Sequence, residues 1–295
     1  IDNNPTPAVK LSAASLSIFG DSGIDGVSIT EAINLSGGLR AEAETIAVTG
    51  ANLVAGGSIA FLASASTTSS LGSAVARITL DAADFNAAAI VLTANANASA
   101  SSSLNFGPGA AALINTTATA EVLVTNATRL TSSGDVTLHA DSVTVTQAVS
   151  RAVGGTGSVS ADAAVATSVV TGSAKVNVAG GTIDVDGAVE LAATNSRTVT
   201  TLADGTAGGS TAVGATVAVS TVSGDTEASI DGSSHVLKAG SVKVSATKLD
   251  SISTTAKSTA GGAQHSSGAP TAAENTLTTN NAETSSGKVT VAGAV

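Results

Sequence analysis

The sequence predicts an all-β fold, a parallel β-helix (β-solenoid) built from stacked coils with an approximately 53-residue sequence repeat. One observation is a string that occurs three times, at Gly134–Ala140, Gly187–Ala193 and Gly240–Ala246, at a constant spacing of the glycines (187 − 134 and 240 − 187). Each copy places apolar residues at every second position, the period of a half-buried strand. A second observation is the lack of Cys, Met, Trp and Tyr, with only four Phe in 295 residues. The core must therefore consist of small side chains in a regular stack.

The repeat length leads to an expectation about the coils. Such a period is long for one solenoid coil, so we expect two or three coils in each repeat. Strands of neighbouring coils lie about 4.8 Å apart, so about 12–16 coils would give a rod of roughly 60–75 Å. A right-handed parallel β-helix is the first choice for the coil, and a flattened β-roll is the second.

The chain divides into three parts. Residues 1–12 contain Pro5 and Pro7 in a polar setting and are expected to form an extended linker. Residues 13–75 hold short apolar runs between glycines, which predicts less regular N-terminal coils. Within them, Gly57–Ala63 is an early, imperfect copy of the repeated string.

Residues 76–295 carry the explicit repeat. A second signature, Ala-x-Val/Ile, precedes each copy of the glycine string, beginning at Ala76, Ala120, Ala174 and Ala228. Between the copies lie stretches rich in Gly, Ala, Ser and Thr, such as Val153–Val170 and Ala203–Gly224. Alternation persists in them, so we expect strands whose inward side chains are small because the facing sheet is close. Residues 258–282 are weakly patterned and are expected to be loose or looped out.

Charge and composition exclude several classes. The net charge is −10 and the 12 basic residues are scattered, whereas nucleic-acid binding needs clustered Lys and Arg. No run of 18 apolar residues occurs, so no membrane span is expected. The absence of cysteine excludes disulfides and thiolate metal sites. The chain starts at Ile1 without an initiator Met or signal peptide, which predicts a fragment or a processed piece.

The sharpest local string is Phe19-Gly-Asp-Ser-Gly-Ile-Asp-Gly26, similar to the serine blocks of lipase-like and chymotrypsin-like hydrolases, with Ser22 as nucleophile. A serine nucleophile needs a histidine base oriented by an acid. The three histidines, His139, His235 and His265, stand in no matching motif. We therefore favour a Gly/Asp/Ser turn between strands and predict no catalytic residue.

Calcium could bind turns that carry Asp21 and Asp25, or Asp184 and Asp186, through oxygen ligands. Neither the EF-hand spacing nor the Gly-Gly-x-Gly-x-Asp spacing is present. Aspartate is common in turns, so solvated turn carboxylates are favoured, and no metal or cofactor is predicted.

Three segments resemble the long repeat regions of bacterial filamentous adhesins, of the filamentous-haemagglutinin and leukotoxin-type filamentous kind. They are Ala228–Gly232, Ala239–Ala246 and the Gly/Ala/Val stretch Ala203–Val219, and the resemblance covers roughly residues 76–295. It implies a secreted, extracellular β-helical stalk at the bacterial cell surface, which holds a binding tip away from the cell. Host, cell-surface or matrix partners would then bind through parts outside this chain.

The function we expect is that of a non-enzymatic structural segment, a stalk or fibre, that can associate with itself laterally or end to end. An alternative is a β-helical carbohydrate-active enzyme, although such a site needs grouped carboxylates and usually aromatic platforms. A further alternative is an ice- or matrix-binding solenoid with ranked threonines. Thr144 with Thr146, and Thr198 with Thr200, hint at such ranks, which Lys243 interrupts.

Overall fold

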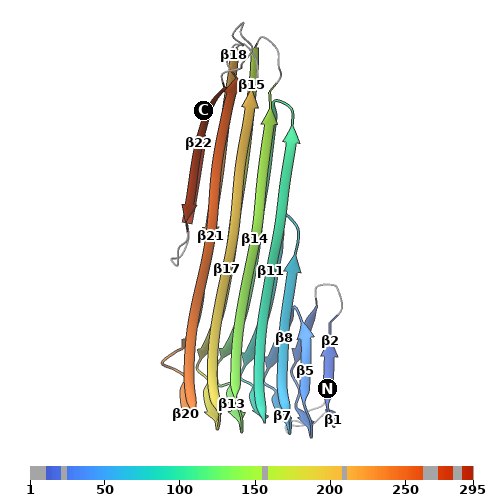
Figure 1. Cartoon of the computed structure of the whole chain (residues 1–295). Helices are drawn as coiled ribbons and strands as arrows, with labels where there is room; N and C mark the ends of the chain where they lie inside the picture. The colour runs from blue at the N-terminus through green and yellow to red at the C-terminus, as the bar shows by residue number, and fades with distance from the viewer. Residues whose placement is uncertain are drawn as a thin grey trace.

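A computed structural model describes residues 11–20, 25–154, 159–207, 211–261, 272–281 and 288–294 of the chain. These residues form strands and connecting turns, without a helix. The strands belong to three sheets in which neighbouring strands are parallel and come from successive passes of the chain, apart from two antiparallel strands at the C-terminus. The fold is therefore a stacked parallel β-solenoid, as predicted, and Figure 1 shows that the longest strands run along its long dimension.

Each coil contributes one strand to each sheet. The first sheet has the order β1 (Leu11–Ala13), β4 (Ile33–Leu35), β7 (Asn52–Ala55), β10 (Asp84–Ala87), β13 (Arg129–Ser132), β16 (Thr182–Val185) and β20 (His235–Lys238). The second has the order β2 (Leu16–Phe19), β5 (Leu39–Ala43), β8 (Ser58–Thr67), β11 (Ala89–Phe106), β14 (Val136–Val153), β17 (Ala188–Ala207), β21 (Ser241–Gly261) and β22 (Ala272–Asn281). The third has the order β3 (Gly26–Ile29), β6 (Thr45–Thr49), β9 (Ser73–Asp81), β12 (Gly109–Thr125), β15 (Val159–Ala179), β18 (Thr211–Ser223) and β23 (Lys288–Ala294), and β19 (Thr226–Ile230) also pairs with β15.

The coils lengthen along the chain. In the first sheet, Ile33 pairs with Leu53, whereas Asp84 pairs with Arg129, so the separation in sequence more than doubles (53 − 33 against 129 − 84). Arg129 in turn pairs with Thr182, one full sequence repeat later (182 − 129). The added residues lengthen the second and third sheets, whose strands grow from 4 residues in β2 and β3 to 21 in β15 and β21. The solenoid therefore has a three-sided base and a two-sheet arm that rises from its larger coils.

The expectation of two or three coils per repeat is wrong. Val136 pairs with Val189, and Val189 pairs with Val242, so one sequence repeat is one coil. The first sheet has seven strands in the described residues, so the stack is about 30 Å high at 4.8 Å per coil. The long dimension instead follows strands of 18–21 residues, about 60–70 Å at 3.3 Å per residue. The sequence period could not reveal the size of the coil, because one long coil and several short coils give the same period.

The repeated glycine string opens the strands of the second sheet, and its inward positions stack in columns. Val136, Leu138 and Ala140 are fully buried, as are their partners Val189 and Leu191 in the next coil. The early copy Gly57–Ala63 occupies the same columns two coils before, since β8 pairs with β11 and β11 with β14. A Cβ on Gly134 would lie 2.5 Å from the carbonyl oxygen of Ala88, which explains why the string begins with glycine. The predicted alternation is confirmed.

The base and the arm have different interiors. The base encloses a single cluster of Ile, Leu, Val and Ala, with Phe61 and Phe85 in edge-to-face contact at 6.0 Å between ring centroids. In the arm, the inward side chains are mostly Ala, Ser, Thr and Gly, with Ala164, Ala166 and Ala203 fully buried between the sheets. The stretches rich in Gly, Ala, Ser and Thr form β15, β17 and β18, so the prediction of strands with small inward residues is confirmed.

The chain reverses direction after its last long strand. β22 pairs antiparallel with the second half of β21, from Ile252 onward, and β23 pairs antiparallel with β18. Of the segment 258–282, which was expected to be loose, residues 258–261 form part of β21 and 272–281 form β22, while 262–271 and 282 fall outside the described residues. The described part of this segment is therefore strand, contrary to the expectation. Most of the expected N-terminal linker, residues 1–10, also falls outside them.

Candidate functional site

Of the serine-hydrolase residues considered above, the structure describes His139 and His235. Ser22, Asp21 and His265 lie outside the described part of the chain. His139 lies on the outer face of β14, in the second sheet, and His235 is exposed at the start of β20, in the first. The two described histidines therefore belong to different faces of the solenoid.

Of the aspartates considered for calcium binding, Asp184 and Asp186 are engaged with cationic side chains, and Asp21 lies outside the described residues. Asp184 accepts a hydrogen bond from Arg129 at 3.4 Å, and Asp186 forms an ion pair with Lys238. The backbone N–H of Asp25 donates to the Glu44 carboxylate at 2.5 Å. In the described residues, no group of three or more His, Asp or Glu side chains is placed to hold a metal ion.

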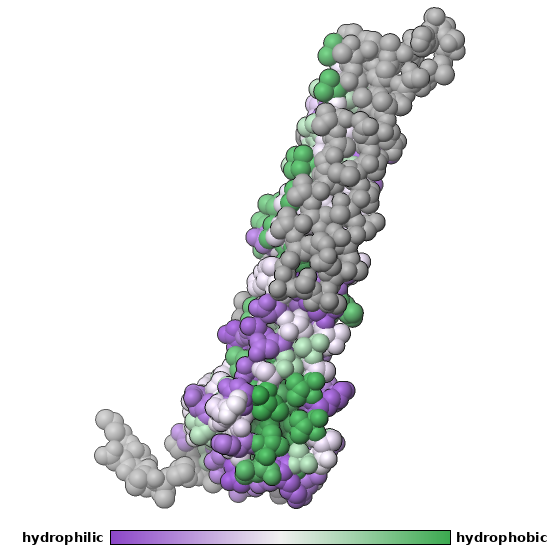
Figure 2. Space-filling model, turned by 90° about the vertical axis from the view of Figure 1, so that its left-hand side faces the viewer, coloured by the Kyte–Doolittle hydropathy of each residue, from purple (hydrophilic) through white to green (hydrophobic). Residues whose placement is uncertain are grey.

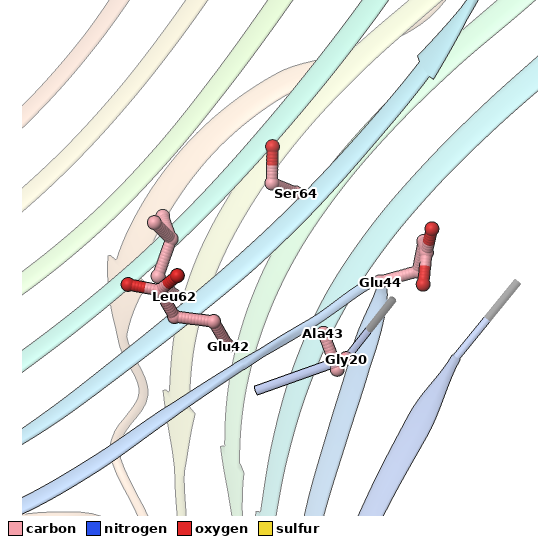
Figure 3. A pocket seen from close by; sticks show the side chains of 6 residues that line it. All are labelled: Gly20, Glu42, Ala43, Glu44, Leu62 and Ser64. Carbon is pink, nitrogen blue, oxygen red and sulfur yellow. The ribbon is translucent and has the colours of Figure 1, made fainter. Parts of the chain in front are cut away.

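A shallow pocket near the N-terminal coils brings two carboxylates to one place. Its lining consists of Gly20, Glu42, Ala43, Glu44, Leu62 and Ser64. Figure 3 shows the side chains of Glu42 and Glu44 directed away from each other. Glu42 pairs with Arg40, whose guanidinium lies 5.9 Å from the ring centre of the exposed Phe19. The two carboxylates thus face different partners instead of a shared reaction centre.

Most ion pairs connect one coil with the next. In the third sheet, Arg77 bonds Glu121 at 2.6 Å, and Glu121 stands beside Lys175 in register. In the second sheet, Lys243 bonds Glu190 of the preceding coil at 2.6 Å. The Lys243 ammonium lowers the pKa of Glu190, by hydrogen bonding first and by its charge second. The outer charges thus form short columns that cross the coil boundaries.

The most buried ion pair lies inside the arm. Arg197 on β17 donates from Nε and Nη2 to the two carboxylate oxygens of Asp250 on β21, at 2.7 and 2.5 Å. Its Nη1 donates to the carbonyl oxygen of Ser223 at 2.5 Å. Both side chains are almost fully buried, at 0% and 3% exposure. Gly172 on the facing sheet provides the space, because a Cβ there would lie 2.9 Å from the Arg197 Cδ atom.

Two inward layers further along the arm, beyond the layer of Val199 and Ile252, four hydroxyl groups form a buried chain. Thr254 donates to Ser220, Ser220 to Thr201, and Thr201 to Ser168, each at 2.7 Å. The chain alternates between the second and third sheets and crosses two coil boundaries. Since buried hydroxyls are costly without partners, this chain ties the two sheets together by polar contacts where large apolar side chains are missing.

A single carboxylate is buried further along the same interior. Asp162 is 5% exposed, and its two oxygens have no hydrogen-bond partner in the described residues. It occupies space left by two glycines, since a Cβ on Gly205 or on Gly214 would lie 2.4 Å from one of its oxygens. Burial raises the pKa of Asp162; its own backbone N–H opposes this rise, and the charge of Asp204 adds to it.

The proposed threonine ranks are not on one face. Thr144 and Thr146 are buried inside the arm, and their neighbours in the next coil are Arg197 and Val199. Thr198 is exposed on the outer face of β17, beside Val145 of the preceding coil. The observation that suggested an ice-binding face is therefore overturned.

Sequence reasoning missed the buried polar residues of the arm, although the pattern contains them. Counting by twos from Val189 makes Arg197 inward, and counting by twos from Val242 makes Asp250 inward at the same place in the next copy. Two opposite charges at equivalent inward positions of neighbouring repeats predict a buried pair. This signal becomes visible only when one repeat is taken as one coil.

These features define a parallel β-solenoid whose coils are joined by polar and ionic columns. Comparisons with protein-family models, with curated proteins and with solved structures found no match to the chain. No helix in the described residues is long and apolar enough to cross a membrane.

Proposed function

We propose that the chain is a non-enzymatic structural segment of a large secreted bacterial surface protein. In this role it spaces an adhesive part from the cell, as a stalk or fibre, and associates with further copies of itself. The extracellular location and the adhesin relationship come from the resemblance of residues 76–295 to filamentous adhesin repeats. Host or matrix components would bind through other parts of the parent protein.

The observation that carries this proposal is the continuous pairing of the arm. Over its whole length β14 pairs in register with β17, and β17 pairs along its full length with β21. Hydrogen bonds of a parallel ladder run between coils, so bending the arm sideways would break many of them together. A stiff, narrow projection of about 60–70 Å suits a spacer.

The ion pairs between neighbouring coils also support a structural role. Arg77, Glu121, Glu190 and Lys243 bind partners in adjacent coils. An enzyme site would instead direct its titratable groups toward a common point with perturbed pKa values. In the Gly20–Ser64 pocket, Glu42 pairs with Arg40 instead.

A replacement experiment tests the spacer role. The parent protein is displayed on bacteria with this chain, with a sequence-unrelated solenoid of similar dimensions, or with a flexible linker of equal residue number. A spacer predicts that adhesion to host cells survives the unrelated solenoid and falls with the flexible linker. Loss of adhesion with both replacements would show that the chain's own surface binds the target, and the spacer proposal would be abandoned.

The carbohydrate-active alternative has a separate test. The purified chain is incubated with a panel of acidic and neutral polysaccharides, and release of reducing or unsaturated ends is measured. The spacer proposal predicts no release. Release that disappears in Glu42→Gln or Glu44→Gln would instead establish the enzymatic alternative at the Gly20–Ser64 pocket.

A further inference from the structure

The C-terminal end of the stack exposes positions that are buried in the coil before it. Val242 and Val244, in the first half of β21, are 49% and 45% exposed, whereas their register partners Val189 and Leu191 are fully buried. Val236 on β20 is 41% exposed above the fully buried Ile183. Figure 2 looks onto this end and shows a continuous hydrophobic patch over the base. The patch is the interior of the solenoid base left uncovered.

The backbone at this end is uncovered as well. Among the described strands, β19 and β20 pair only with the preceding coil, and β22 covers β21 only from Ile252 onward. Within this part of the structure, residues 241–251 of β21 therefore pair on one side only. A strand edge with free N–H and C=O groups is a template for a further strand, and here three such edges surround one apolar patch.

The N-terminal end of the stack has the complementary form. In the described residues β1, β2 and β3 pair only with the following coil. The interior is open here too, as a hollow lined in part by Leu16, Ile18, Ile29 and Ile33. The first coil thus presents three free strand edges around aliphatic side chains.

We propose that the last coil of one copy binds the first coil of a second copy, so that the solenoid base continues from chain to chain. This inference rests on the proposed structural function and assigns its end-to-end self-association to defined surfaces. The contact repeats the interface between coils in two sheets: β20 and β21 would receive β1 and β2 in the same parallel register. β19 belongs to the preceding coil, because it pairs with β15, whereas β20 and β21 pair with β16 and β17. The partner that binds this end is therefore a second copy of the chain, because the contact has the same form as the one between neighbouring coils.

Side chains match when the columns of the base are continued by one coil. Following the register through the stack places Leu16 after Val242, and Ile18 after Val244, in the second sheet. In these columns aliphatic side chains follow aliphatic side chains, so the contact buries apolar surface without burying a charge.

A contact between two identical C-terminal ends fits less well. A two-fold axis reverses the order of strands around the base, so no more than one of the three free edges could meet its own copy. The parallel arrangement pairs both edges of the last coil, β20 and β21, at once, as between neighbouring coils of the chain. Such a head-to-tail contact is heterologous and does not close, and it therefore builds a linear series of oligomers.

The reversed strand at the C-terminus leaves room for this partner. In the continued register β2 would end with Phe19 beside Ser245, whereas β22 begins to cover β21 at Ile252. The segment between these two positions spans about 20 Å at 3.3 Å per residue. The short first coil of the second copy therefore fits below β22.

Sedimentation analysis of the full chain over a wide concentration range tests the contact. We expect a series of oligomers that grows with concentration, and Val244→Glu should weaken association at least about tenfold by burying a charge in the interface. Val145→Glu is the matched control, since Val145 is 46% exposed but lies on the outer face of β14. Monomers at all concentrations, or an equal effect of both variants, would overturn the proposal.

Disulfide trapping tests the orientation, and the natural lack of cysteine makes it unambiguous. In the continued register Ser17 stands next to Lys243, with Cα atoms close enough for a disulfide bond. The double variant Ser17→Cys/Lys243→Cys should give a ladder of oxidised oligomers on a non-reducing denaturing gel, and each single variant should run as a monomer. Dimers of Lys243→Cys alone would show a tail-to-tail contact and refute the head-to-tail one. If the chain does not associate, the spacer role is not contradicted, because the replacement experiment on bacterial adhesion tests that role separately.

Discussion

Arg197 and Asp250 occupy equivalent positions of two successive repeats, and their side chains form a two-point ion pair that is almost completely buried between the two sheets of the arm. The third donor of the guanidinium is taken up by the Ser223 carbonyl oxygen on the facing sheet. The pair therefore connects two successive coils and both walls of the arm. It also makes this layer sensitive to the loss of either partner, because a buried charge without its partner is strongly unfavourable.

Asp250→Ala should lower the free energy of unfolding by about 3–5 kcal/mol, since it leaves the Arg197 guanidinium buried without a counter-charge. Urea titration at neutral pH measures this change. Lys243→Ala is the control, because Lys243 also pairs with a residue of the preceding coil but at the surface; its unfolding midpoint should not move measurably. The double variant Arg197→Met/Asp250→Leu should recover most of the stability. An Asp250→Ala variant as stable as the parent would contradict the buried ion pair.

Gly172→Ala should destabilise the arm by about 1–3 kcal/mol through overpacking. The new Cβ would lie 2.8 Å from Asn195 Oδ1 and 2.9 Å from Arg197 Cδ, and Arg197 is fixed by its ion pair. Gly109→Ala on β12 is the matched control, since a Cβ there meets no atom within 4 Å. Thermal or urea unfolding compares the stabilities of the two variants. Equal stability would contradict the close packing of Gly172 against Asn195 and Arg197.

Asp162 should make the protein less stable as the pH rises. Burial raises the pKa of Asp162 above its ordinary value of 3.8. At a pH between 3.8 and this raised pKa, the carboxyl group has lost its proton in the unfolded chain but still holds it in the native state. Under that condition stability falls with increasing pH. Asp162→Asn and Asp162→Ser should both remove this contribution and raise stability near neutral pH. Urea titrations between about pH 4 and about pH 7 give the slope, and an unchanged slope in both variants would refute the assignment.

Thr201→Val should reduce the free energy of unfolding by about 1–3 kcal/mol. It removes an inner hydroxyl of the buried chain, so Ser168 loses its donor and Ser220 loses its acceptor, while Thr254 still donates to Ser220. The side chains have nearly the same shape, so the loss reports hydrogen bonding more than packing. Thr198→Val, on the exposed outer face of the same strand, is the control. If both variants unfold at the same urea concentration, the hydroxyl chain contributes nothing.

The sequence was sufficient to predict the fold class and the inward positions of the repeated string. The alternation around Val136, Val189 and Val242 is strong because one face of each strand is buried, and burial is what a period of two records. The small residues of the arm were also predictable, since two close sheets leave no space for larger ones. These predictions depend on local pattern and composition alone.

The size of the coil could not be predicted from the period, because a repeat states how often a pattern returns and not how often the chain turns. The sequence near the far ends of β14 and β17, around Gly154 and Ala207, has the same Gly, Ser and Thr composition as the strands themselves. The antiparallel return of β22 and the open base above Val244 depend on contacts between distant segments. They therefore required the structure.

The growth of the coils along the chain gives the protein a preferred order of folding. Closing a loop costs entropy that rises with its length, and a coil as long as the one from Arg129 to Thr182 costs about 0.9 kcal/mol more to close than the one from Ile33 to Leu53. The smallest coils should therefore close first, and each larger coil then finds a finished base on which to align. Pulse-labelled hydrogen exchange should show early protection in β5 and β8, before the arm; simultaneous protection throughout would speak against this order. If the chain leaves a ribosome or a secretion pore with its N-terminus first, its coils can close one after another in the order in which they emerge, the smallest first.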